Sequence, residues 1–267
     1  MKIFVANYQP NRVGGGWTFA NNFVKGMGDL IGSYEESDIY FIAGTTMVER
    51  KDVEKARADG KKIVLRLDNA LRNSNNRGTG MSRMKDFCEM ADLVIYQSQW
   101  AKHFLMPFTQ KEGAVILNGV DKSIFYPGDD LNAGNFLYCR SSRDEGKGWI
   151  NAWYWWVNSP KEDVLNIVGK FSSENIDWNF DFYNGESYRF LGERNDMPDI
   201  YRQNGHLLYT YLNDACSNTL LEAIASGLQI IDVDGMLQTG GAPEIMMCED
   251  ISLERMCNQY KKEFEKL

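Results

Sequence analysis

Cysteine and histidine are scarce in this sequence, and it has no long apolar run. The 267 residues include five cysteines and two histidines, and no two cysteines have Cys-x-x-Cys spacing. A disulfide framework, a zinc site and a histidine-based metal site are therefore not expected. No stretch of about 18 apolar residues occurs, so no transmembrane helix is predicted. The opening Met1–Ala6 is too short for a signal peptide and is predicted to be a buried strand, which makes the cytoplasm the expected location.

Negative charge is concentrated in the second half of the chain. Residues 1–120 carry 16 Lys and Arg against 13 Asp and Glu, a net charge of +3, whereas residues 121–267 carry 13 against 24, a net charge of −11. The acidic half argues against nucleic acid as the main partner. The mildly basic half is compatible with an anionic acceptor or with weak peripheral contact with a membrane.

Short apolar runs alternate with helical patterns along the chain. The predicted strands are Lys2–Ala6, Ile39–Ala43, Lys62–Leu67, Leu93–Gln97, Ala114–Leu117, Asn135–Cys139, Val164–Val168, Leu207–Tyr211 and Gln229–Val233. The predicted helices are Trp17–Leu30, Thr46–Asp59, Ser82–Met90, Gln99–Leu105, Lys147–Val157, Pro198–Asn204, Ser217–Ser226 and Ile251–Lys266. This alternation predicts an α/β protein with parallel sheets and right-handed crossovers.

A break in the alternation predicts two domains. Turn-forming and polar residues cluster at Asn118–Asp121 and again at Tyr126–Asp130, where no periodicity is present. We expect a first Rossmann-like domain over residues 1–120, a second over 121–250, and a final helix at 251–267 that returns toward the first domain. In such folds ligands bind at the carboxyl ends of the strands, so a cleft between the two sheets is the expected site.

The most informative motif is the segment Asp214–Gly227, in which two carboxylates, Asp214 and Glu222, are separated by seven residues. Ser217 or a neighbour can cap the following helix, which leaves Asp214 in the loop and Glu222 inside the helix. The N–H groups near Ser217, Asn218 and Thr219 can bind phosphate oxygens. An ordinary amphipathic helix would explain the apolar stripe of this segment but not Asp214 or the small polar run.

Two cations follow the first strand of the second half. Arg140 and Lys147 stand at a strand-to-helix junction, where a point charge and a planar guanidinium together suit a diphosphate. Arg143 is an alternative to Arg140 for this role. Positive charge at this place would neutralise a diphosphate leaving group.

Two glycine clusters also follow predicted strands. Gly14–Gly16 precede the first helix, and glycines there permit close approach of a ligand to backbone. A dinucleotide fingerprint would need a further glycine and an acidic residue after the second strand, and both are missing, so an NAD site is disfavoured. Gly240 and Gly241, just before Glu244, are a turn signal that again permits close approach.

In combination and order these segments resemble the retaining glycosyltransferases of family 4, which have the GT-B fold of two Rossmann-like domains facing across a cleft. Val115–Asp121 with Phe125–Gly128 resembles the interdomain segment of that family. Phe190–Gly192 with Met197, Pro198 and Tyr201 resembles the nucleobase side of its donor site. The segment Asp214–Gly227 resembles its Glu-x7-Glu donor motif, and Gly14–Gly16 match its acceptor-side loop.

The resemblance implies a role for each matching residue. Arg140 and Lys147 would hold the diphosphate, Glu222 the ribose and Asp214 the transferred sugar. The remaining residues of the implied donor site are Ser217, Asn218, Thr219, Gly192, Glu193, Gly15, Gly16 and Glu244.

The sequence departs from the family pattern in three ways. The first acid is Asp214 rather than Glu, so its reach is one methylene shorter. The spacing between Arg140 and Lys147 is longer than usual. No counterpart of the family's active-site histidine is evident, and we expect Asp68 to be the substitute polar group.

The predicted function is that of a metal-independent, retaining glycosyltransferase without a cofactor. Its partners would be a nucleoside-diphosphate sugar donor and a glycan or lipid-linked hydroxyl acceptor. Three alternatives with the same architecture are an epimerase, a phosphorylase and a catalytically silent protein that binds nucleotide or sugar.

Overall fold

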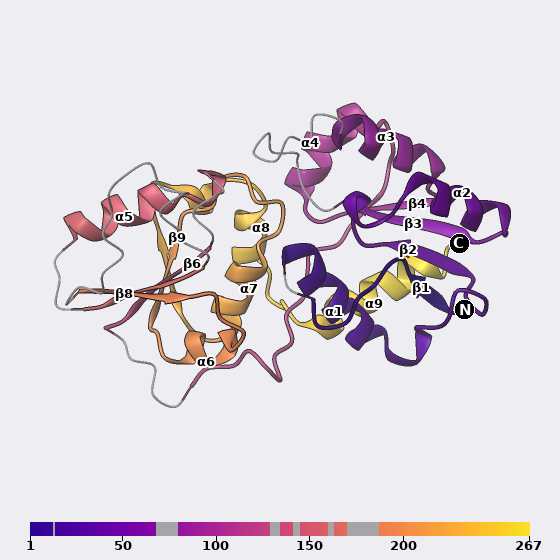
Figure 1. Ribbon diagram of the computed structural model, residues 1–267. Coiled ribbons are helices and arrows are strands. Elements are labelled where there is room, and N and C mark those ends of the chain that lie inside the picture. Colours follow the sequence, from indigo (N-terminus) through magenta and orange to yellow (C-terminus); the bar gives the residue numbers. More distant parts are fainter. Residues whose placement is uncertain (13, 68–79, 129–133, 141–144, 160–162, 170–186) are drawn as a thin grey trace. The chain divides into compact units, whose positions relative to one another are not determined.

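The computed structural model describes residues 1–12, 14–67, 80–128, 134–140, 145–159, 163–169 and 187–267. These residues form two compact units (Figure 1), which are Met1–Asp121 together with Glu244–Leu267, and Lys122–Pro243. The chain passes between the units after Asp121 and again within α8 (Ala242–Met246), whereas the sequence placed the second boundary at residue 250. Asp68 and Arg143 lie outside the described residues.

The first unit contains a five-stranded parallel sheet in the order β1-β2-β3-β4-β5. Its strands are β1 (Ile3–Val5), β2 (Ile39–Ile42), β3 (Lys62–Leu67), β4 (Leu93–Tyr96) and β5 (Ala114–Val115). Its helices are α1 (Gly15–Met27), α2 (Arg50–Ala58), α3 (Gly80–Met90), α4 (Gln99–Thr109) and α9 (Leu253–Phe264), with short 3-10 turns at Gly28–Leu30 and Thr45–Met47.

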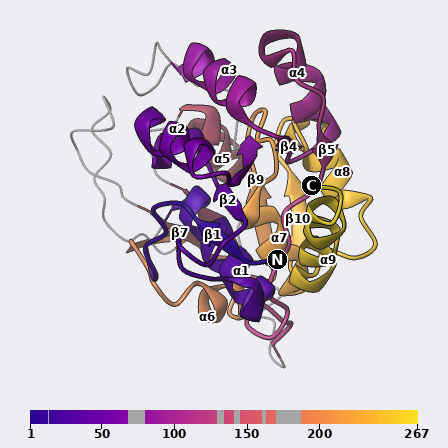
Figure 2. The same cartoon turned by 90° about the vertical axis from the view of Figure 1, so that its right-hand side faces the viewer.

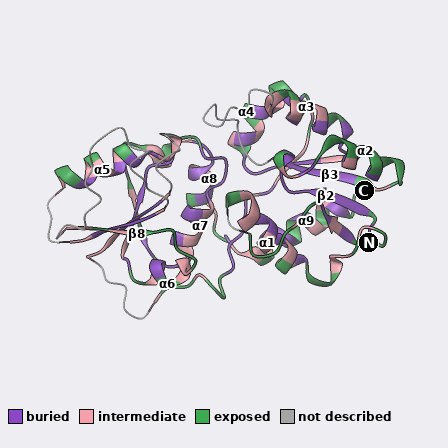
Figure 3. Ribbon diagram, viewed as in Figure 1, coloured by how far each residue is buried: buried purple, intermediate pink, exposed green. Residues whose placement is uncertain are grey.

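Helices cover both faces of this sheet, so most residues of its strands β2, β3 and β4 are buried, whereas the edge strand β5 is half-exposed (Figure 3). One face packs against α2, α3 and α4 through residues such as Val53, Phe87 and Leu105. The other packs against α1 and α9, which lie side by side in Figures 1 and 2. The helix α9 therefore completes the core of the first unit although it is last in the sequence.

Aromatic rings join α9 to α1 and to the sheet. The ring of Phe23 in α1 stacks on Phe41 of β2 with centroids 4.2 Å apart. The ring of Tyr260 in α9 meets Phe23 edge-on at 5.1 Å and Phe41 at 5.8 Å. These side chains are almost fully buried, so the last helix contributes a large apolar area to a core built mostly from the first 120 residues.

The second unit contains another five-stranded parallel sheet, in the order β10-β9-β6-β7-β8. Its strands are β6 (Phe136–Cys139), β7 (Leu165–Val168), β8 (Tyr188–Gly192), β9 (His206–Tyr209) and β10 (Gln229–Asp232). Its helices are α5 (Trp149–Asn158), α6 (Met197–Arg202) and α7 (Asn218–Ala225), with 3-10 turns at Glu145–Lys147 and Met236–Gln238.

The two faces of this second sheet have different cores. Helices α6 and α7 pack on one face through Tyr201 and Ala223. The aromatic helix α5 supplies Trp149, whose ring lies 5.3 Å from that of Tyr138, and Trp156, whose ring lies 5.4 Å from that of Phe136. Trp149 and Trp156 are buried, as expected for a helix whose apolar stripe faces a sheet.

The predicted alternation of strands and helices is confirmed at nearly every element, with four instructive differences. The predicted helix Thr46–Asp59 is divided into the 3-10 turn Thr45–Met47 and α2, and the short helix α8 was not predicted. The helix α4 continues through Pro107 to Thr109, whereas the sequence predicted an end at Leu105. Thr109 is buried, and its hydroxyl lies 3.0 Å from that of Tyr96, so this tertiary contact stabilises the last turn. The edge strand β8 was not predicted, because it is half-exposed and lacks a buried apolar run.

Replacing Tyr260 by Ala should lower the free energy of unfolding by about 3–5 kcal/mol, because the substitution removes a buried ring that contacts both α1 and β2. Chemical denaturation followed by circular dichroism measures the change. The matched control is Asn258→Ala on the exposed face of the same helix, which should change stability by less than about 0.5 kcal/mol. Equal losses in both variants would contradict this account of the core.

Candidate active site

The second sheet has a switch point between β6 and β9. From β6 the chain builds outward through β7 and β8, and it then crosses to β9 and β10 on the other side. Parallel sheets bind ligands at the carboxyl ends of the strands that flank such a point. Arg140 directly follows β6, and Asp214 lies five residues beyond the end of β9, so the fold brings together residues that are far apart in the sequence.

Lys147, Arg140 and Asp214 meet at this edge. The Nζ atom of Lys147 donates a hydrogen bond of 2.7 Å to Oδ2 of Asp214, and an Nη2 atom of Arg140 lies 3.7 Å from the same oxygen. The Lys147 and Asp214 side chains are only 12% and 11% exposed. Charges with so little contact with water interact more strongly than surface ion pairs do. Three of the predicted site residues, Lys147, Arg140 and Asp214, thus form one cluster.

The backbone around Lys147 is tied to the end of β9. The carbonyl of Lys147 accepts a hydrogen bond of 2.6 Å from the hydroxyl of Thr210, and Leu212 N–H donates to the carbonyl of Gly146 at 3.0 Å. Gly148 has a φ of +66°, and a Cβ there would lie 2.3 Å from the Thr210 carbonyl oxygen. Glycine is therefore required for this turn to lie against β9 and to place the lysine beside Asp214.

The backbone of Asp214 is held by the glycine pair that follows β10. Gly241 N–H donates to the carbonyl of Asp214 at 2.8 Å, and a Cβ on Gly240 would lie 2.4 Å from that same oxygen. Asn213 adopts a left-handed φ of +52°, and its N–H donates to the hydroxyl of Thr239 at 3.2 Å. The glycine pair was expected to permit close approach of a ligand. In the structure it permits close approach of the backbone of the Asp214 loop.

Tyr211 is a site residue that the sequence analysis missed. The guanidinium of Arg140 lies 4.6 Å from the centroid of its ring, and the Lys147 ammonium lies 5.5 Å from it. The Tyr211 hydroxyl donates to the carbonyl of Cys139 at 3.3 Å, which fixes the ring between the two cations and β6. Cation–π contact of this kind orients charged groups. The signal available in the sequence was the position of Tyr211 at the end of a predicted strand, three residues before Asp214.

The helix α7 begins beside the cluster. Ser217 is its N-cap, and the Ser217 hydroxyl accepts a hydrogen bond of 3.3 Å from Leu220 N–H. The same hydroxyl lies 3.4 Å from Nη2 of Arg140. Asn218 and Thr219 occupy the first turn, which contains no acidic residue. The positive end of the helix dipole and the two cations therefore act on the same space, an arrangement suited to an anion.

Glu222 lies on α7 in a less polar environment than Asp214. The Tyr201 hydroxyl donates to its Oε2 atom at 3.0 Å and lies 3.6 Å from the sulfur of Cys139. Burial raises the pKa of Glu222 from 4.5 to about 7, although the Tyr201 hydrogen bond and the charge of Arg140 act in the opposite direction. The electrostatic environments of the two carboxylates thus differ. Asp214 forms ion pairs with two cations, whereas Glu222 accepts a hydrogen bond from the Tyr201 hydroxyl.

The remaining predicted residues lie elsewhere. Gly192 ends β8 with a φ of +69° and is exposed, as is Glu193. Gly15 and Gly16 begin α1 in the first unit, so they belong to a different unit from Asp214.

Glu244 belongs to the first unit, where its carboxylate caps the helix α4. Its two oxygens accept hydrogen bonds from Gln99 N–H at 2.7 Å and Trp100 N–H at 2.9 Å. A carboxylate is favoured at this end of a helix because of the helix dipole. The pairing explains why the chain joins the first unit at Glu244.

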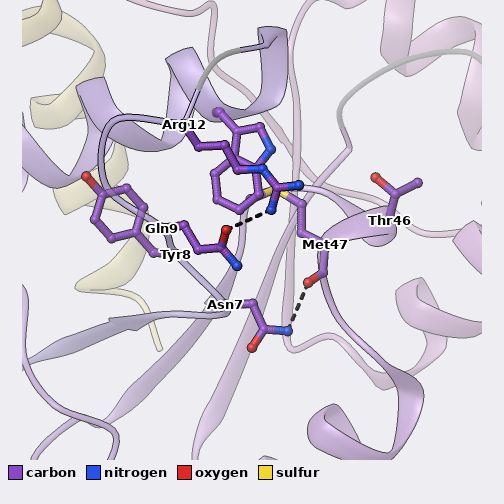
Figure 4. Close-up of a pocket in the computed structure, with 7 residues that line it drawn as sticks. Asn7, Tyr8, Gln9, Arg12, Thr46 and Met47 are labelled. Atoms are coloured by element: carbon purple, nitrogen blue, oxygen red, sulfur yellow. Dashed lines mark hydrogen bonds between the residues drawn. The ribbon is translucent and has the colours of Figure 1, made fainter.

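The first unit has a cavity of its own, shown in Figure 4. Its volume is about 600 Å³, and the residues lining it are Asn7, Tyr8, Gln9, Arg12, Trp17, Thr46 and Met47. The sequence motifs pointed to the neighbouring glycines but to none of these side chains.

No group of three or more His, Cys, Asp or Glu residues that could hold a metal ion lies together within the part of the chain that the structure describes.

No family model matches the sequence. No curated protein matches it either.

Solved structures are similar in fold at low sequence identity. Anabaena HepE in complex with UDP has a TM-score of 0.71 at 14% identity, covering 100% of this chain and 90% of that one. Sucrose-phosphate synthase from Thermosynechococcus elongatus has a TM-score of 0.72 at 10% identity, covering 100% and 99%. The lipopolysaccharide outer core galactosyltransferase WaaB in its apo form has a TM-score of 0.62 at 15% identity, covering 100% of both chains. The fold is therefore the GT-B fold of two Rossmann-like units.

The raised pKa of Glu222 predicts a pH-dependent stability. Below pH 4.5 the group is protonated in both the folded and the unfolded chain, and as the pH rises through about 7 the folded protein must ionise a poorly solvated carboxyl. The wild type should therefore lose on the order of 1–3 kcal/mol relative to Glu222→Gln between pH 4.5 and pH 8. Urea denaturation of both proteins across this range measures the difference.

The control for this experiment is Glu193→Gln, which removes an exposed carboxylate from the same unit. Its stability should follow the wild type at every pH. A constant offset between wild type and Glu222→Gln from pH 4.5 to pH 8 would show that Glu222 ionises as it does in water.

Proposed function

We propose that the protein is a retaining glycosyltransferase that transfers a sugar from a nucleoside-diphosphate sugar to a hydroxyl of a glycan or lipid-linked acceptor. The observation that carries the proposal is the convergence of Lys147 and Arg140 on Asp214, with Arg140 also beside Ser217, the N-cap of α7. The fold supports it, because HepE was solved in complexes with UDP, with UDP and glucose, and with UDP-glucose.

In the proposed reaction Lys147 and Arg140 bind the diphosphate and stabilise its charge as it leaves. The bond between the sugar's anomeric carbon and the phosphate oxygen breaks, and the acceptor oxygen bonds to that carbon on the same face. The departing phosphate takes the proton of the acceptor hydroxyl. Fixed positive charge at the leaving group lowers the barrier because it is oriented before the reaction begins. No metal ion or cofactor is assigned a role.

The two carboxylates have separate roles in this proposal. Asp214 releases Lys147 to the incoming diphosphate and accepts hydrogen bonds from the transferred sugar. Glu222, one helical turn inside α7, accepts from the ribose hydroxyls when it is ionised, and Gly192 and Glu193 lie toward the base. Ser217, Asn218 and Thr219 present backbone N–H groups to the phosphates.

We place the reaction in the cytoplasm. All five cysteines are free, and Cys88, Cys139, Cys216 and Cys257 are buried. Free thiols are typical of proteins in reducing compartments.

The variants Asp214→Asn and Glu222→Gln should separate catalysis from nucleotide binding. Asp214→Asn removes the charge that faces the oxocarbenium-like transition state, so turnover should fall about 10²–10³-fold. Its affinity for a nucleoside diphosphate should be kept or increased, because Lys147 and Arg140 lose a competing carboxylate. Glu222→Gln should weaken nucleoside-diphosphate binding about ten-fold. Calorimetry and donor turnover measure the two quantities.

Equal losses of binding and turnover in Asp214→Asn would make Asp214 a donor-binding or structural residue. No change in either quantity would favour a catalytically silent binding protein. Cleavage of the donor by free phosphate would identify a phosphorylase.

The metal-independent mechanism is tested by measuring turnover in excess chelator, where activity should be kept. Activity that is lost in chelator and restored by Mn²⁺ or Mg²⁺ would contradict this mechanism.

We further propose weak peripheral contact with a membrane through α4. Its residues Trp100, Phe104 and Phe108 recur every four positions, and their rings lie 5.3 Å and 6.3 Å apart in succession. Phe104 is 46% exposed and Phe108 is 53% exposed. Exposed aromatic rings on one helix face suit the interface of a bilayer. None of the described helices is long and apolar enough to cross a membrane.

Replacing Phe104 and Phe108 together by Ser should abolish this contact. Sedimentation with vesicles of phosphatidylcholine and phosphatidylglycerol should recover part of the wild type with the lipid and little of the double variant, because two rings no longer enter the interface. The control is Tyr154→Ser, which removes an aromatic ring that is 55% exposed on α5. Equal recovery of the wild type and the double variant would exclude α4 as the contact.

A further inference from the structure

The cavity of the first unit is built from two loops that follow neighbouring strands. Asn7, Tyr8, Gln9 and Arg12 come from the loop after β1, and Trp17 from the first turn of α1. Thr46 and Met47 come from the turn after β2. A volume of about 600 Å³ suits a ligand the size of one or two sugar rings. Most of these side chains can form hydrogen bonds.

Contacts within the first unit hold the loop after β1 in shape. The Tyr8 hydroxyl donates to the Asn21 side chain at 3.0 Å, and the Asn21 amide donates to the carbonyl of Arg12 at 3.3 Å. The Asn7 amide donates to the carbonyl of Met47 at 2.9 Å, which joins the two loops. A cavity with walls tied in this way loses little entropy when a ligand binds.

The charge of its lining residues gives the cavity a preference for anions. Arg12 is the only charged residue among those that line it, and none of them is acidic. Its guanidinium lies 4.8 Å from the centroid of the Trp17 ring. Its Nη1 atom donates a hydrogen bond of 2.7 Å to the Gln9 side chain, and Figure 4 draws this bond as a dashed line. Arg12 forms no ion pair with a residue that the structure describes.

The position of the Arg12 guanidinium over the Trp17 ring affects how Arg12 can bind an anion. A guanidinium that lies on an aromatic face keeps its N–H groups in its own plane, where they can meet a carboxylate or phosphate with two parallel hydrogen bonds. The α1 helix begins nearby with no acidic residue in its first turn, so the helix dipole adds to the positive potential.

We propose that the acceptor carries an anionic group, a phosphate or a carboxylate, that binds Arg12 in this cavity. The inference rests on the proposed glycosyltransferase function and adds the chemical class of the acceptor. The anionic group would bind the guanidinium while hydroxyls of the same sugar meet Asn7, Gln9 and Thr46. Arg12 would thus determine specificity for the acceptor without a role in binding the donor.

The test compares neutral and anionic probes on Arg12 variants. Saturation-transfer NMR titrations use glucose, glucose 6-phosphate and glucuronate, and the corresponding galactose and mannose compounds, each with the full-length protein in saturating UDP. The wild type should bind at least one phosphate or uronate about ten-fold more tightly than the parent sugar. Preference for the 6-phosphates identifies a phosphate, and preference for the uronates identifies a carboxylate.

Arg12→Gln should abolish this preference, and Arg12→Lys should keep part of it because the charge remains. The matched control is Arg57→Gln, an exposed arginine on α2 outside the cavity, which should bind as the wild type does. UDP affinity, measured by calorimetry, should be the same in all four proteins, because the proposed diphosphate and ribose contacts of Lys147, Arg140 and Glu222 lie in the other unit.

Three results would overturn the inference. They are no preference of the wild type for any anionic sugar, a preference that survives in Arg12→Gln, and a parallel loss of UDP binding in Arg12→Gln. Failure of the proposed function is distinct, since a protein that binds no nucleoside diphosphate in any variant has no donor site.

Discussion

The ion pair between Lys147 and Asp214 is the interaction on which the architecture of the second unit's site depends. Two charged side chains, each about one-eighth exposed, lie 2.7 Å apart at the carboxyl edge of the sheet. Removing such charges from water is unfavourable unless each is compensated. The compensation requires two loops at fixed positions, and both are fixed by glycines, Gly148 against Thr210 and Gly240 against Asp214 itself. A side chain at either glycine would separate the charges.

The same pair explains how one short motif can supply two different acids. Asp214 lies in a loop beside Lys147 and Arg140 and is a fully compensated carboxylate. Glu222 is on the helix, faces the phenol of Tyr201, and has a pKa raised to about 7 by burial. Eight positions along the chain therefore separate a carboxylate that is paired with two cations from one whose pKa is raised by burial.

The two units also differ in the charged groups that they present to a ligand. The second unit holds two cations beside a helix N-terminus, an arrangement that suits a diphosphate. The first unit holds one arginine on an aromatic ring inside a polar cavity, which suits a smaller anion with hydroxyl groups. The last helix, α9, packs its aromatic residues into the first unit's core, and Glu244 caps α4. The chain thus returns to complete the unit with which it began.

The sequence alone predicted the α/β alternation and nine of the ten described strands, and it pointed to Asp214, Lys147 and Arg140, which the structure brings together. Those features are local, because a buried strand needs consecutive apolar residues and a capped helix needs Ser217 within one turn of its start. Tertiary structure alone decided that Tyr211 lies under Arg140, that Gly240 packs on Asp214, that α4 continues past Pro107, and that Arg12 faces a cavity. Each of these depends on a contact between segments distant in sequence or on the shape of a loop, and hydrophobic periodicity carries no information about either.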